Sequence, residues 1–137
     1  MKIFLDTNIL LDIFLERGDF LEDALSILQL GIDKNVELSA SPLTFATCHY
    51  ILQKERNKRE ATEILRALKP FVTMTTMDEA QGCKALYSNM PDFEDMLQLE
   101  SAFAANCDMI ITRNKKHFPK EPVTVLTPSE FWEFYGS

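Results

Sequence analysis

The sequence predicts an α/β fold in which a parallel sheet of short strands is covered by helices on both faces. Segments with apolar residues at helical spacing alternate with short runs that are apolar throughout. Runs of the second kind are typical of strands buried on both faces, as in parallel sheets. The 137 residues, 46% of them hydrophobic, suit one globular unit. We therefore expect a single domain over residues 1–137.

The first part of the chain is predicted to form a strand, two helices and a second strand. Residues 2–5 are a short apolar strand. Residues 6–16 carry apolar side chains at helical spacing, and Gly18 breaks that pattern. Residues 20–34 present one apolar stripe, which again indicates a helix. Residues 36–40 read as the second strand.

The middle of the chain is predicted to add three helices and a third strand. Ser41-Pro42 combines an N-cap residue with proline at the first helical position, so a helix begins there. Residues 59–68 form a further helix, 71–73 a third short strand, and 78–88 another helix.

The last part is predicted to hold a strongly periodic helix over residues 93–106. Two apolar strands follow, over 108–112 and 123–126. Thr127-Pro-Ser-Glu130 combines a capping box with proline at the first helical position. A terminal helix is therefore expected to begin at this motif.

The charge balance argues against a general nucleic-acid-binding protein, although it leaves a nuclease open. The net charge is −7, whereas such binders depend on Lys and Arg to neutralise phosphates. Carboxylates that hold Mg²⁺ make a nuclease site acidic, while a basic partner or solubility is the alternative explanation. No segment has the apolar length of a secretory or membrane-spanning sequence. The three cysteines form no close pair, so we expect a cytoplasmic protein without membrane contacts.

Polar side chains follow two predicted strands and begin one helix. The first strand is followed by Asp6, the strand over 108–112 ends in Thr112, and the helix over 93–106 begins near Asp95. Ligands of parallel sheets bind at the carboxyl ends of the strands, and carboxylates gathered there suit Mg²⁺. Spacing alone, however, favours an N-cap role for Asp6 and a helix-dipole role for Asp95.

Four segments in order resemble signatures of the PIN-domain nucleases and span almost the whole chain. These segments are 3–12 (IFLDTNILLD), 93–98 (FEDMLQ), 108–118 (DMIITRNKKHF) and 125–131 (VLTPSEF). The resemblance implies a three-layer α/β/α sandwich with a parallel sheet, often dimeric. It implies a Mg²⁺- or Mn²⁺-dependent endoribonuclease, and in many bacterial members a VapC-type toxin paired with an antitoxin.

The resemblance also assigns roles to individual residues. Asp6 and Asp95 become the catalytic and metal-binding residues, Asn114 a further metal ligand, and Glu94 and Thr112 weaker ones. The expected RNA-binding residues are Asn8, Arg113, Lys115 and Lys116, because polar and basic side chains beside the site can hold phosphates. The other basic stretch, 54–69, is interleaved with glutamates and is typical of a solvated helix pair, with an RNA-guiding surface as its alternative.

The sequence departs from the family pattern at three usually acidic positions. Thr47 stands where the family usually has Glu, and Asn114 and His117 stand where it often has Asp. Fewer carboxylates bind Mg²⁺ more weakly. This favours a second hypothesis, a catalytically weak or inactive PIN-like module that binds RNA or protein, whereas retention of Asp6 and Asp95 favours the nuclease. We expect the three replaced positions to face the cleft of these two carboxylates.

Overall fold

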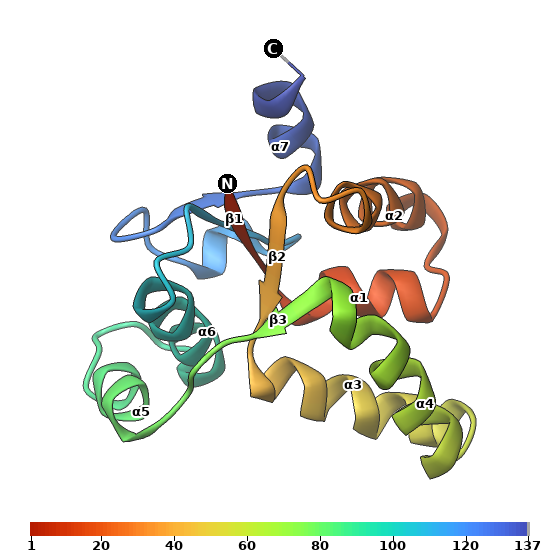
Figure 1. Ribbon diagram of the computed structural model, residues 1–137. Helices are drawn as coiled ribbons and strands as arrows, with labels where there is room; N and C mark the ends of the chain where they lie inside the picture. Colours follow the sequence, from red (N-terminus) through yellow and green to blue (C-terminus); the bar gives the residue numbers. More distant parts are fainter. Residues whose placement is uncertain (137) are drawn as a thin grey trace.

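Five parallel strands form the centre of the molecule, which the computed structural model describes over residues 1–136 (Figure 1). The strands are β1 (Lys2–Leu5), β2 (Glu37–Ala40), β3 (Val72–Met74), β4 (Met109–Ile111) and β5 (Thr124–Leu126). Their order in the sheet is β3-β2-β1-β4-β5, and every neighbouring pair is parallel. The predicted α/β class with a short-stranded parallel sheet is confirmed.

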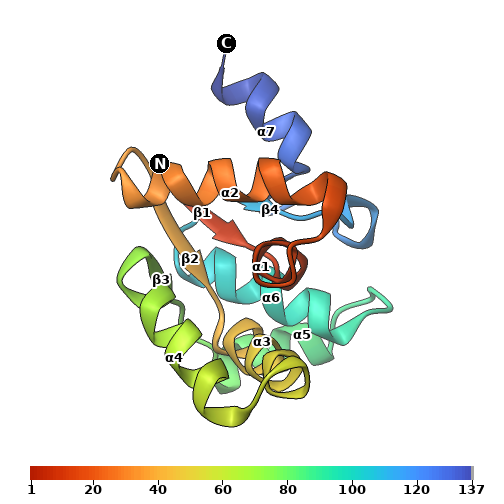
Figure 2. The same cartoon turned by 90° about the vertical axis from the view of Figure 1, so that its right-hand side faces the viewer.

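Helices cover both faces of this sheet (Figure 2). They are α1 (Thr7–Phe14), α2 (Gly18–Ile32), α3 (Pro42–Glu55), α4 (Lys58–Leu68), α5 (Glu79–Leu86), α6 (Phe93–Ala104) and α7 (Pro128–Tyr135). Two short 3₁₀ turns, Lys69–Phe71 and Lys115–His117, complete the described elements. No helix of residues 1–136 combines the length and apolar character that crossing a membrane requires.

Side-chain alternation along the strands explains the two cores. Ile3 and Leu5 belong to the core beneath α1, α2 and α7, whereas Phe4 between them belongs to the core beneath α5 and α6. Ile110 likewise points to the side opposite Ile111. Successive residues of a strand face opposite sides of the sheet. A strand that is apolar throughout therefore fits a sheet with helices on both faces.

Local capping signals account for most helix starts, and the element boundaries lie within two residues of those expected. Ser41 caps α3, and Thr127 with Glu130 forms the predicted capping box of α7. The first helical segment ends before Gly18 as expected, and Gly18 is itself the first residue of α2, two residues before the expected start. Its φ of +28° lets the chain turn there, and glycine adopts that conformation without the Cβ clash of other residues.

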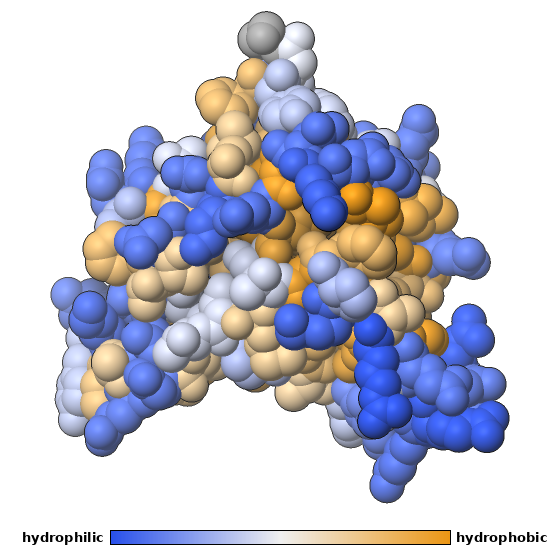
Figure 3. All heavy atoms as spheres, viewed as in Figure 1, coloured by the Kyte–Doolittle hydropathy of each residue, from blue (hydrophilic) through white to orange (hydrophobic). Residues whose placement is uncertain are grey.

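The basic stretch over residues 54–69, which runs from the end of α3 along α4, is a charged, solvated surface. Arg59 and Glu63 lie one turn apart on α4 at 3.9 Å, with both side chains largely exposed. Figure 3 shows hydrophilic residues gathered over this helix pair, at the lower right of the view. This arrangement is that of the solvated helix pair expected from the sequence.

Strand register brings the ends of β1 and β4 together. Leu5 pairs with Ile111, and the backbone N–H of Asp6 donates to the Ile111 carbonyl at 3.0 Å. The residues after these two strands, Asp6 and Thr112, are therefore neighbours at the carboxyl edge of the sheet.

Candidate metal centre

A cleft of about 210 Å³ lies at this carboxyl edge, between α1, α3, α6 and the loop after β4. It collects most of the side chains that the sequence assigns to metal binding or to family acidic positions. Those that line it are Asp6, Thr47, Glu94, Asp95 and Asn114. The edge predicted by the parallel-sheet rule is thus where these residues meet.

Asp6 is held in one position by three neutral donors. Its Oδ1 accepts from the backbone N–H of Thr7 at 2.8 Å and from Gln98 Nε2 at 3.1 Å. Its Oδ2 accepts from the Thr112 hydroxyl at 2.7 Å. Asp6 is also the N-cap of α1, so the capping role and a place in the cleft coexist in one buried carboxylate. No cation in the described part of the chain pairs with it.

Asp95 reaches the cleft from the first turn of α6. Asp92, the N-cap of this helix, accepts the backbone N–H of Asp95 at 2.9 Å. The pKa of Asp95 is raised from 3.8 to about 6, chiefly by burial and also by the carboxylates of Asp92 and Asp6, while His117 opposes the shift. A carboxyl group pushed towards its neutral form by burial and like charges marks a place where a cation would be favourable.

Gln98 organises the cleft, although the sequence assigned it no role. It is buried, its Oε1 accepts from the Ser41 hydroxyl, and its Nε2 donates to Thr44 at 2.7 Å as well as to Asp6. The signal in the sequence is a polar residue three positions after Asp95, on the same face of the helix.

The remaining candidate ligands differ in their availability. Thr112 is fully buried, and its hydroxyl also accepts from the backbone N–H of Asn114 at 3.0 Å. This geometry favours a supporting role for Thr112, since its hydroxyl proton is directed to Asp6. His117 does not line the cleft and lies instead beside Asp95, with 3.5 Å between Nδ1 and Oδ2.

Arg113, expected to contact phosphate, is engaged within the fold. Its Nε and Nη2 donate to Asp12 Oδ2 and Oδ1 at 2.7 and 3.1 Å. Its guanidinium also lies 4.1 Å from the centre of the Phe20 ring. Asp12 is buried and does not line the cleft, so the pair ties α1 to the loop after β4.

The other expected RNA-binding residues lie in the first turn of α1 and on the 3₁₀ turn of that loop. Asn8 lines the cleft and accepts the backbone N–H of Arg113 at 3.3 Å. Lys115 pairs with Glu130 at 2.9 Å. Lys116 is exposed and has no ion pair within residues 1–136.

The donor set suits a hard, hydrated cation. Among the described residues no three His, Cys, Asp or Glu side chains are grouped for metal binding. The cleft therefore offers two close carboxylates, Asp6 and Asp95, the more exposed Glu94 and neutral oxygens on Thr47 and Asn114. Mg²⁺ is commonly held by one or two carboxylates, several waters and substrate phosphates. These residues fit such an ion and lack the nitrogen and sulfur ligands typical of zinc.

Sequence and structure comparisons agree on the kind of protein that this chain resembles. A family model described as a PIN domain matches residues 2–116. Ribonuclease VapC1 of Aquifex aeolicus (strain VF5) is 28% identical over 141 residues, spanning 99% of this chain and 96% of that protein.

Solved structures show the same fold. A chain of VapBC2 from Rickettsia felis, bound to a promoter DNA fragment, has a TM-score of 0.68 and 20% identity, covering 93% of this chain and 98% of that one. A chain of a toxin–antitoxin complex from Klebsiella pneumoniae has a TM-score of 0.65 and 26% identity, covering 92% and 97%.

Proposed function

Because this chain belongs to the PIN-domain family, we propose that it is a Mg²⁺- or Mn²⁺-dependent endoribonuclease of the VapC type. The meeting of Asp6 and Asp95 in one cleft at the carboxyl edge of the sheet carries the proposal. The near full-length likeness to a protein named ribonuclease VapC1 supports the same activity.

The two carboxylates would hold the ion, and their neighbours would fix them in place. A bound divalent ion supplies charge neutralisation at phosphate and activation of water. Asp6 Oδ2 accepts one hydrogen bond, from Thr112, and so keeps a lone pair for a cation. Gln98 and the backbone N–H of Thr7 hold Oδ1. Such fixed ligands need little rearrangement when ion and RNA bind.

We also propose that the protein is a toxin whose partner is a cognate antitoxin. We propose further that it is a single domain, forms a homodimer and acts in the cytoplasm. Several similar solved structures are VapBC or toxin–antitoxin complexes. The net charge of −7 suits a partner with a basic segment.

Cleavage of single-stranded RNA is expected to require Mn²⁺ or Mg²⁺ and to stop in excess chelator, because two carboxylates alone cannot neutralise phosphate charge. Labelled RNA is incubated with protein and each metal, and products are separated on a gel. Asp6→Asn protein purified in parallel controls for contaminating nucleases. Cleavage that persists in chelator, or that is equal in the Asp6→Asn preparation, would contradict the proposal.

A catalytically weak RNA- or protein-binding module is the second candidate. It is favoured by Thr47 and Asn114, which line the cleft at positions where the family resemblance implies acidic residues. The double variant Thr47→Glu/Asn114→Asp is expected to bind Mn²⁺ about tenfold more tightly, because it adds two carboxylates to the cleft. Calorimetry measures this affinity. The control Asn35→Asp/Thr73→Glu adds the same charge away from the cleft.

The two candidates differ in what that double variant does to RNA. If wild-type protein is inactive and the variant cleaves, the second candidate is supported. If the variant binds Mn²⁺ no better than the wild type or the control, the assignment of these two positions to the metal centre is wrong.

A further inference from the structure

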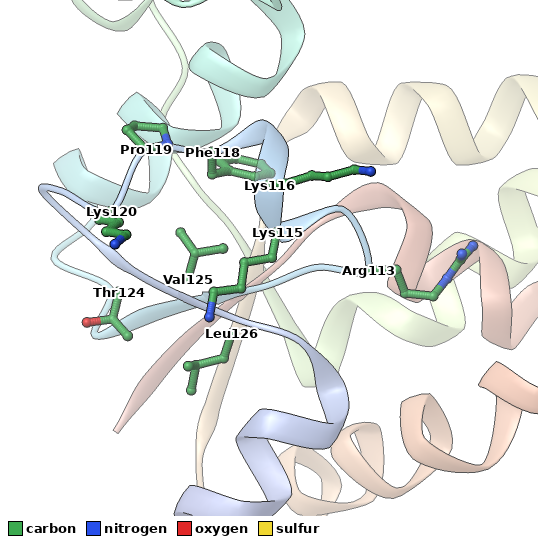
Figure 4. Close-up of a pocket in the computed structure, with 9 residues that line it drawn as sticks. All are labelled: Arg113, Lys115, Lys116, Phe118, Pro119, Lys120, Thr124, Val125 and Leu126. Carbon is green, nitrogen blue, oxygen red and sulfur yellow. The ribbon is translucent and has the colours of Figure 1, made fainter.

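A larger pocket, of about 750 Å³, lies beside the loop that follows β4 (Figure 4). Four cations line it, namely Arg113, Lys115, Lys116 and Lys120, and no carboxylate does. The whole chain has 14 Lys and Arg against 21 Asp and Glu. The lining of this pocket therefore has the opposite sign to the molecule, and its preferred ligand is an anion.

Two of these cations remain available to a ligand. Arg113 is held by Asp12, and Lys115 by Glu130. Lys116 and Lys120 are exposed, and neither has an ion pair within residues 1–136. Figure 4 shows Lys120 beside Thr124 and the Lys116 side chain extending away from it, so the two ammonium groups suit two separated negative groups.

The wall between the lysines is apolar. The buried residues Phe118 and Val125 line it, together with Leu126, which follows Val125 in its strand. The strand is β5, which pairs only with β4 and so forms the edge of the sheet. An apolar surface flanked by cations matches a nucleotide chain, in which flat bases alternate with phosphates.

The pocket and the metal cleft share one loop. Asn114 lines the cleft, whereas its neighbours Arg113 and Lys115 line the pocket. Consecutive residues are about 3.8 Å apart along the backbone. A strand of RNA that enters the cleft can therefore continue over this loop into the pocket.

We propose that this pocket is a subsite for single-stranded RNA, in which Lys116 and Lys120 bind backbone phosphates and the apolar wall receives a base. The inference rests on the proposed ribonuclease activity and deepens it, because it assigns the path of the substrate beyond the metal centre. A base in the pocket must be unpaired, so duplex RNA is excluded from the subsite.

The test measures binding rather than cleavage. A fluorescein-labelled, 2′-O-methylated single-stranded oligonucleotide is titrated with the protein in chelator, and fluorescence anisotropy gives the Kd at several salt concentrations. Lys116→Ala/Lys120→Ala is expected to weaken binding about tenfold or more. It is also expected to reduce the slope of log Kd against log salt by about 1.4, roughly 0.7 for each lost phosphate contact on a single strand.

Two further variants separate the pocket from general charge effects. Lys58→Ala/Lys69→Ala removes the same charge from exposed positions at the two ends of α4 and is expected to change the Kd little. Thr124→Trp fills the pocket from its exposed edge-strand position without changing charge, and is expected to weaken binding. Melting temperatures equal to the wild type establish that both variants fold.

Each result bears on the subsite separately from catalysis. Unchanged Kd for both Lys116→Ala/Lys120→Ala and Thr124→Trp overturns the inference, as does an equal loss in the α4 control. The inference is also overturned if the oligonucleotide does not bind and a glutamate-rich peptide binds tightly through the same two lysines. If the pocket variants lose oligonucleotide binding while the wild type shows no metal-dependent cleavage, the subsite stands and the proposed ribonuclease activity fails.

Discussion

Replacing Asp6 with asparagine is expected to slow Mn²⁺-dependent RNA cleavage by about 100-fold or more. Loss of groups that only support metal ligands commonly costs about 10- to 100-fold, and a direct ligand should cost at least as much. Asn keeps the shape and the Oδ1 acceptor but removes the charge that Thr7, Gln98 and Thr112 hold in place. Single-turnover cleavage rates measure the effect.

Asparagine is the informative replacement at this position because Asp6 is also the N-cap of α1. Asn caps helices about as well as Asp, whereas Ala would cost about 0.5–2 kcal/mol of stability. The melting temperature of Asp6→Asn should therefore stay near that of the wild type. Asp19→Asn, at an exposed position in α2, is the matched control. A wild-type cleavage rate in Asp6→Asn would remove Asp6 from the metal centre.

Asp6 illustrates how far sequence reasoning reached. The short apolar strand, the polar residue directly after it and the parallel-sheet rule were enough to predict its element and its edge. From the sequence, an N-cap role and a metal-binding role were alternative explanations of this one residue. In the structure the same side chain caps α1 and lines the cleft. The two roles are compatible because a cap needs one acceptor and a carboxylate has several.

Arg113 illustrates what the sequence could not supply. Its place beside the candidate site predicted a phosphate-binding cation, and no local pattern linked it to Asp12. The two meet only because β1 and β4 are adjacent, which lets α1 face the loop after β4. Gln98 is similar, because its partners Ser41 and Asp6 come from distant segments. Pairing across elements depends on register and sheet order, and local patterns do not encode either.

Asp95→Asn is expected to raise the melting temperature at pH 7 in chelator, by about 3 °C or more. The pKa of Asp95 is raised from 3.8 to about 6 in the folded protein, so folding disfavours its ionised form. The cost is absent below about pH 4, grows between pH 4 and 6, and is complete above pH 6. The shift corresponds to at most about 3 kcal/mol, and partial exposure of the carboxylate reduces that figure.

The same substitution is expected to remove the response to metal. Mn²⁺ should raise the melting temperature of the wild type, because it binds the native state alone, and should leave Asp95→Asn unchanged. The backbone N–H of Asp95 still donates to Asp92 in the variant, so the start of α6 is preserved. Thermal melts at pH 4 and pH 7, with chelator or Mn²⁺, test both effects, and Asp19→Asn is again the control. If Asp95→Asn melts lower than the wild type at pH 7 and keeps its full Mn²⁺ response, Asp95 is a structural residue and the metal centre loses its second ligand.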